Sequence, residues 1–222
     1  IVESEYHIRK AKRPLPESGE ALQAPNRKQN FHTWFMDNGF RIQPMRTGES
    51  EWTFGLKLVG YGPEGTIHPI QVSEPEAEIS RVRYPHDEII QWCENRDDGL
   101  EHGFTINDPV DGNTLEVRMM ITGNLTPSLS GDACMELVNE YGVRVLTYDR
   151  LVVTDAEGRG LEASFRLGDN RLSIIVDIEH ASFPVEIDPL ASTPSWVLLG
   201  NQPEALLGYS VSCAGDVNGD GY

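Results

Sequence analysis

Side-chain oxygens at alternate positions near the end of the chain have the spacing of a cation-binding loop. Asp216, Asn218 and Asp220 are followed by Gly221 in the segment GDVNGDGY. Calcium takes about six to eight oxygen ligands, and Asp or Asn at alternate positions of a tight loop supplies the first of them. This spacing predicts a calcium site. The alternative is a solvated turn, because clusters of Asp, Asn and Gly commonly form one.

The residues before this loop favour a strand rather than a helix. In the segment YSVSCA (209–214), larger side chains alternate with serine and alanine, which is the period-2 pattern of a strand. An EF-hand would place its loop between two helices and would need a bidentate Glu at the end of the loop. The predicted calcium loop is therefore expected to follow a strand.

With that strand included, the segment LLGYSVSCAGDVNGDGY (206–222) resembles the opening of an FG-GAP repeat, the blade of integrin-alpha-like β-propellers. Gly208-Tyr-Ser210 stands where the family has Gly-x-Ser, and the closing GDVNGDGY matches the family loop. The resemblance implies a Ca²⁺ ion held by Asp216, Asn218, Asp220 and a carbonyl near Tyr222, completed by an Asp beyond Tyr222. It also implies that most of a propeller follows, so that this chain is a fragment with an incomplete loop.

Three earlier segments are similar to the β-rich region that precedes FG-GAP repeats in large secreted bacterial proteins. They are WCENRDDGLEHGFTI (92–106), LTYDRLVVTDAEGRGLEA (146–163) and IIVDIEHASFPVEIDPL (174–190). They carry a GLE-x-GF-T motif and a YP-x-x-IDP motif in which Phe183 replaces the tyrosine. The resemblance implies an architecture and assigns no reaction.

A second group of polar residues, between positions 84 and 102, is the densest in the chain. A pair of carboxylates can hydrolyse a glycoside when one of them is buried enough to stay protonated. The alternative, which we favour for so acidic a protein, is a set of solvated loop charges. His86 or His102 with Asp87 or Glu101 can also be considered as metal ligands, although no His-x-His spacing supports this. The group comprises Tyr84, His86, Asp87, Glu88, Glu94, Asp97, Asp98, Glu101 and His102.

Three tryptophans are candidates for a sugar-stacking platform, because aromatic faces suit carbohydrate rings. Trp34, Trp52 and Trp92 nevertheless occupy period-2 positions, which favours packing in the core. A carbohydrate-binding module would need two of them exposed side by side. Neither a Gly-x-Ser-x-Gly elbow nor a phosphate-binding glycine loop followed by a helix is found.

The strands expected to position these residues follow from alternation and turn signals. Residues 31–36 and 40–44 alternate around the turn Asp37-Asn-Gly39, which predicts a hairpin. Further strand-like runs are 52–58, 78–83, 104–107, 114–122, 143–148, 150–154, 162–167, 171–177 and 185–187. Short strands separated by Gly, Asn and Asp turns predict an all-β fold, an antiparallel sandwich that is extended or in two parts.

The chain divides into three parts by composition. Residues 1–30 carry three prolines and no clear period, which indicates an N-terminal arm. Residues 31–190 form the β-sandwich region, and residues 191–222 comprise a linker that begins with ASTPS and the start of a truncated propeller blade.

Charge and cysteine content bear on partners and compartment. A net charge of -17 disfavours nucleic acid and anionic membranes as partners and attracts divalent cations. No apolar run is long enough to span a membrane, and any export signal is expected to have been removed. Cys93 and Cys134 are compatible with a disulfide or with free thiols, since no CxxC pair is present.

These features lead to one expected function and one alternative. We expect a non-catalytic module, extracellular or on a cell surface, that precedes a calcium-binding propeller and serves adhesion, binding or scaffolding. Its partners would be calcium and a cell-surface glycan or protein. The alternative is the accessory region of a secreted carbohydrate-active enzyme, with its carboxylates among residues 84–102.

Overall fold

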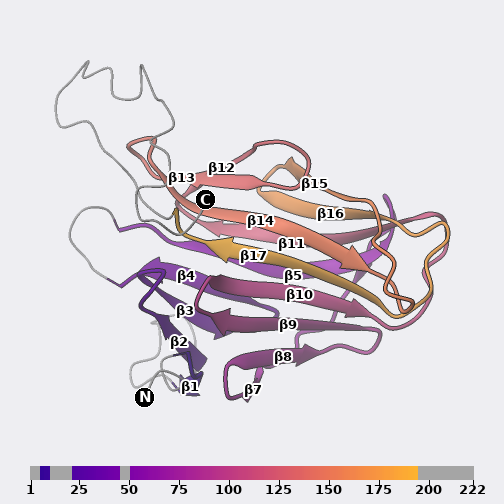
Figure 1. The fold of residues 1–222 in the computed structure, drawn as a ribbon, viewed down its shortest axis with the longest axis horizontal. Helices are drawn as coiled ribbons and strands as arrows, with labels where there is room; N and C mark the ends of the chain where they lie inside the picture. Colours follow the sequence, from indigo (N-terminus) through magenta and orange to yellow (C-terminus); the bar gives the residue numbers. More distant parts are fainter. Residues whose placement is uncertain (1–5, 11–21, 46–50, 195–222) are drawn as a thin grey trace, which may run out of the picture.

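The computed structural model describes residues 6–10, 22–45 and 51–194 as an all-β structure of two antiparallel sheets. Most of the long strands run along the long axis of the molecule (Figure 1). Within the described residues no helix forms, so none there is long and apolar enough to cross a bilayer. The all-β class and the two-sheet arrangement predicted from the sequence are confirmed, whereas the predicted propeller strand falls within residues 195–222, outside the described part.

The nine-stranded sheet contains most of the N-terminal strands. Its order is β1 (Arg9–Lys10), β2 (Leu22–Asn26), β3 (Phe31–Met36), β4 (Gly39–Pro44), β5 (Phe54–Pro63), β11 (Thr114–Gly123), β16 (Arg171–Asp177) and β15 (Ala163–Gly168), with β6 (His68–Pro69) paired to β5.

The eight-stranded sheet lies against it. Its order is β12 (Thr126–Leu129), β13 (Met135–Val138), β14 (Arg144–Thr154), β17 (Val185–Ser192), β10 (Gly99–Ile106), β9 (Ile89–Arg96), β8 (Arg81–Pro85) and β7 (Glu76–Glu78). The N-terminal end is tied to this sheet as well, because Ile8 N donates to Ile79 O.

The core lies between the two sheets and is built from alternate residues of each strand. In β3, Phe31 and Phe35 are fully buried while His32 and Trp34 face outward. Burying a large apolar side chain contributes about 1.5–3 kcal/mol, so this alternation fixes which face of the strand packs inward. The β3–β4 hairpin predicted from it is confirmed, with Phe35 opposite Phe40.

Polar contacts between the sheets supplement the apolar core at one end. Asn26 of β2 donates through Nδ2 to Asn95 Oδ1 of β9 at 3.0 Å and to the Arg96 carbonyl at 2.6 Å. The Asn95 amide in turn donates to the carbonyls of Tyr6 and Pro25. Both asparagine side chains are buried, and together they join the two sheets to the N-terminal segment.

Some strands differ from their prediction. Residues 22–26, which the sequence placed in the arm, form β2 and pair with β3. The runs 143–148 and 150–154 form a single strand, β14, interrupted by a register shift between Asp149 and Val152. The run 78–83 is divided by a turn at residues 79–80, so that its two halves belong to β7 and β8.

Candidate functional site

The calcium ligands predicted from the sequence cannot be placed in the fold. Asp216, Asn218, Asp220 and Tyr222 all lie outside the described residues. Among the residues that are described, no group of three or more His, Cys, Asp or Glu side chains could hold a metal ion. The calcium site therefore stays a prediction from the sequence.

The polar group between residues 84 and 102 is spread over the molecule by the β9–β10 hairpin. Glu88 precedes β9 and Asp97 follows it, and these nine residue steps (97 − 88 = 9) put their Cα atoms roughly 30 Å apart. At the far end of the hairpin, Asp97 pairs with Lys28 and Asp98 with Arg150. These carboxylates therefore do not form one site.

His102, a candidate metal ligand from the sequence, is a fully buried core residue. Gln91 Nε2 donates to His102 Nε2 at 2.9 Å, because an amide nitrogen is only a donor, and Nδ1 then carries the proton and donates to the Tyr148 hydroxyl at 2.9 Å. Burial lowers the pKa of His102 to about 3. Both ring nitrogens are occupied within the core, so His102 has a structural role there.

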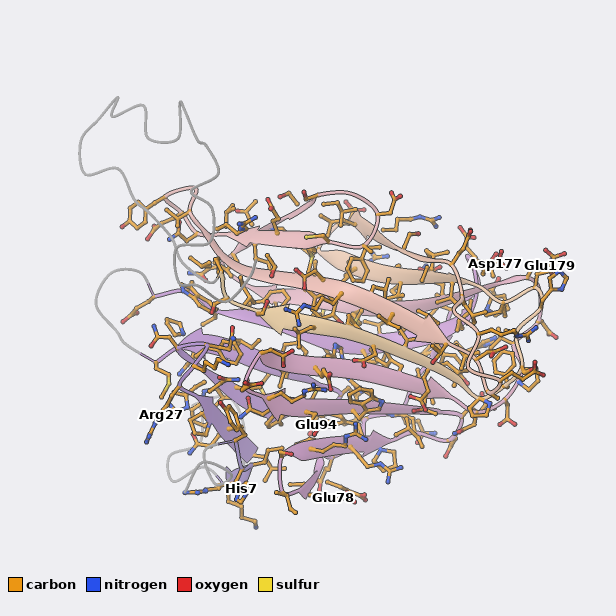
Figure 2. The ribbon with its side chains drawn as sticks, viewed as in Figure 1. His7, Arg27, Glu78, Glu94, Asp177 and Glu179 are labelled. Atoms are coloured by element: carbon orange, nitrogen blue, oxygen red, sulfur yellow. The ribbon has the colours of Figure 1, made fainter. Side chains whose placement is uncertain are left out.

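Three residues of the same group, His86, Asp87 and Glu88, lie at the β8–β9 turn and line a groove there. They are separated from Glu94 and Glu101, which come from the middle of the hairpin. Figure 2 shows Glu94 over the middle of the eight-stranded sheet, well away from Asp177 and Glu179 at the end of the molecule.

The middle of the hairpin gathers charged side chains on the outer face of the eight-stranded sheet. Ile89, Gln91 and Cys93 of β9 face the core, so the alternate residues project outward. The register pairs Glu94 with both Arg81 and Glu101. We call this group the outer cluster; it comprises Arg81, Trp92, Glu94, Arg96, Glu101 and Asp188.

Arginines in the outer cluster engage two of its three carboxylates. Arg81 Nη2 lies 2.9 Å from Glu94 Oε2, and Arg96 Nη1 is hydrogen-bonded to Glu101 Oε1. Arg81 also stacks on Trp92, with its guanidinium carbon 4.4 Å from the ring centroid. Each partly exposed ion pair contributes only about 0–1 kcal/mol, so their main effect is to fix the side chains in place.

Trp92 lies flat against the sheet because the residue beneath it has no side chain. A Cβ placed on Gly103 would lie 2.1 Å from Trp92 Cζ2, far inside van der Waals contact. With Gly103 below and Arg81 above, only 7% of Trp92 is exposed. The group that comes close to this glycine is therefore the indole ring of Trp92.

Asp188 of β17 is the carboxylate of the outer cluster without an arginine bonded to it. The register that pairs Phe104 with Ile187 and Glu101 with Leu190 places Gly103 opposite Asp188, on the same face as Trp92. Asp188 Oδ1 is buried and has no hydrogen-bond partner. Burial first, and then the charge of Glu101, raise the pKa of Asp188 to about 6.

The tryptophans do not form the platform that a carbohydrate-binding module would need. Trp52 is 7% exposed and packs in the core, and Trp92 is covered as described above. Trp34 is half-buried on β3, in the other sheet. That hypothesis is wrong for these three rings, because period-2 placement directs them to different faces. Cys93 and Cys134 are free thiols.

Sequence reasoning did not identify Asp188 or Tyr61 as site residues. Asp188 appears in the sequence only within the YP-x-x-IDP motif, and Glu101, whose charge acts on it, is 87 positions earlier (188 − 101 = 87). Only strand register brings the two together. Tyr61, at the end of β5, donates a hydrogen bond to Glu88 of the groove. Comparison with protein-family models, curated proteins and solved structures finds no match to this chain.

Proposed function

We propose that the chain is a non-catalytic binding module of a secreted or cell-surface protein, placed ahead of a calcium-binding FG-GAP propeller and serving adhesion or scaffolding. The observation that carries the proposal is the distribution of the 84–102 carboxylates. They lie at both ends and on one outer face of the sandwich, and most are bonded to Lys28, Arg81, Arg96 or Arg150. Such an arrangement suits a rigid surface better than an acid–base pair.

The exit of the chain from the sandwich supports a position ahead of a further domain. β17 ends at Ser192 in the interior of the eight-stranded sheet. The next residue, Thr193, donates from both its backbone N and its Oγ1 to Gln29 Oε1, each at 2.9 Å. The end of β17 is therefore held at a fixed point, and the segment that resembles a propeller blade follows it in the sequence.

Calcium binding by that segment gives a direct test of the proposal. Equilibrium dialysis of the natural full-length protein should lose at least one bound Ca²⁺ when Asp216 and Asp220 are both replaced by Asn, because two carboxylate ligands disappear. Asp169→Asn together with Asp177→Asn is a control for the loss of two negative charges and should leave the stoichiometry unchanged. Unchanged calcium binding in the 216/220 variant would remove the basis for the propeller.

A second function is favoured by one observation, the raised pKa of Asp188 beside Glu101. A carboxylic acid that stays protonated near neutral pH can donate a proton to a leaving group, while an ionised neighbour acts as base or nucleophile. In that case the chain would belong to a secreted carbohydrate-active enzyme. Hydrolysis of aryl glycosides that is abolished by Asp188→Asn would establish this function and overturn the non-catalytic proposal. An absence of hydrolysis across a panel of sugars would count against the second function.

A further inference from the structure

A groove of about 290 Å³ opens at the end of the sandwich where β5 and β8 finish. One wall is the irregular segment 70–73, which follows β6, and the other is the β8–β9 turn with Asp87 and Glu88. The groove is separate from the outer cluster, with which it shares no residue. Its volume is close to the lower limit for small-ligand sites, which is enough for one side chain of a partner.

The groove presents negative charge without a compensating cation. Its lining includes no lysine or arginine, and within the described residues neither Asp87 nor Glu88 takes part in a salt bridge. This contrasts with Glu94 and Glu101, which are both paired with arginines. Unpaired carboxylates at the mouth of a groove attract a cation, and the net charge of -17 adds to that attraction.

Tyr61 holds one of these carboxylates in position. Its hydroxyl donates to Glu88 Oε2, and burial together with Glu88 raises the pKa of Tyr61, so the hydroxyl keeps its proton. The second oxygen of Glu88 has no bonded partner among the described residues. Ile70 and Val72 supply an apolar wall, along which the aliphatic stem of a lysine or arginine can pack while its charged end reaches a carboxylate.

The wall formed by residues 70–73 is held in place before any ligand arrives. Asn38, in the β3–β4 turn, donates through Nδ2 to the Gln71 carbonyl at 3.3 Å and accepts from Ser73 N through Oδ1 at 2.7 Å. Ser73 Oγ donates to the Pro85 carbonyl at 2.9 Å, which joins the two walls. A preformed groove loses less conformational entropy on binding.

His86 is a half-buried residue in the lining of the groove. Neither ring nitrogen is solvent-accessible or makes a hydrogen bond of good geometry, and the fully buried Gln91 likewise has an Oε1 without a well-formed hydrogen bond. Burial lowers the pKa of His86 below its ordinary value, while the Gln71 carbonyl, Asp87 and the Gln91 side chain partly offset this shift by favouring the imidazolium. The ring is therefore neutral at neutral pH and gains a charge only in acid.

We propose that this groove binds a basic side chain, a lysine or arginine of a partner protein, and that protonation of His86 in acid weakens the binding. The ligand's cation contacts Glu88 and Asp87, and its stem packs on residues 70–72. Because the nitrogens of His86 are covered, His86 acts on the ligand through its charge. The groups facing His86 and the ligand are Tyr61, His68, Asp87, Glu88 and, near Tyr61, Asp108.

The test uses a capped peptide, acetyl-Gly-Gly-Arg-Gly-Gly-amide, titrated into the full chain at low salt and followed by amide NMR shifts. The neutral control replaces arginine by citrulline, which keeps the shape and removes the charge. The arginine peptide should shift the amides of residues 70–73 and 86–89 at pH 7.5 and should bind more weakly at pH 5. The citrulline peptide should produce no such shifts.

Variants separate the groups that the proposal uses. Glu88→Gln should weaken binding of the arginine peptide at least about fivefold, whereas Glu76→Gln, which removes an exposed charge on β7, should not. His86→Gln should leave the affinity for the arginine peptide unchanged at pH 7.5 and should make the loss of affinity at pH 5 smaller. Any loss of affinity that remains in this variant is caused by the carboxylates. Equal binding of the two peptides, or shifts scattered over the acidic surface, would overturn the site. An unchanged pH dependence in His86→Gln would overturn the switch.

Discussion

The contact between Asn26 and Asn95 offers the sharpest test of how the two sheets are joined. Asn26→Ala removes the hydrogen bonds that Nδ2 donates to Asn95 Oδ1 and to the carbonyls of Arg96 and Gly99, and one accepted from Gln29 N at 3.1 Å. Leaving a buried polar group without a partner costs about 1–3 kcal/mol. Since Asn95 is buried and cannot turn to water, we expect a loss of about 2–4 kcal/mol in the free energy of unfolding.

Urea unfolding followed by tryptophan fluorescence measures this loss. With a slope of about 2 kcal/mol per molar urea, the midpoint should fall by about 1–2 M at an unchanged slope. Asn26→Asp preserves the shape and the acceptor but replaces the donating amide by an oxygen, so it should destabilise at least as much as Asn26→Ala. Asn107→Ala, at an exposed loop position, is the matched control and should change stability by less than about 0.5 kcal/mol. A midpoint for Asn26→Ala equal to that of the control would refute the reasoning.

Three further outcomes follow from the outer cluster and the core. Gly103→Ala should push Trp92 off the sheet, lowering stability by about 1–3 kcal/mol and red-shifting tryptophan fluorescence; an unshifted spectrum would contradict the close contact. Asp188 has a folded pKa raised to about 6, so wild-type stability should decline as pH rises from about 4 to 6. Asp188→Asn should therefore be more stable than wild type above pH 6, by about 1 kcal/mol after allowing for solvent screening, as read from urea midpoints at pH 4 and 7.5. His102 has a folded pKa lowered to about 3. The neutral ring should therefore make its full contribution to the free energy of unfolding above about pH 6.5, and this contribution should be lost as the pH falls toward 3. His102→Phe should remove part of that acid sensitivity, and an identical pH slope would count against the neutral buried ring.

Alternation predicted the strands in which large apolar side chains recur at every second position. β3 and β4 were identified because Phe31, Phe35, Phe40 and Ile42 recur in this way around an Asn-Gly turn. β9 was not predicted because Gln91 and Asn95 face the core. Polar residues at these inward positions interrupt the alternation of apolar and polar residues on which the prediction depends. β14 was divided into two runs because its register shift at Asp149 breaks the period.

The candidate site was less predictable than the fold because it depends on register between distant strands. Trp92 and Glu94 share a face because residues 89–96 form β9, a strand that alternation did not predict. The position of Asp188 opposite Gly103 depends on the pairing of β10 with β17, and a shift by one residue would turn Asp188 into the core. The loop with Asp216, Asn218 and Asp220 had the clearest spacing in the chain and remains a prediction.

The place of β17 in its sheet determines how the module resists a mechanical load. A pull on the chain beyond Ser192 acts along a strand that is flanked by β10 on one side and β14 on the other. The two ladders are then loaded in shear, so that many hydrogen bonds must break together before the strand slides. An edge strand such as β12, held on one side only, would instead peel away one bond at a time. The sandwich should therefore resist tension applied at this end more strongly than tension applied to an edge strand.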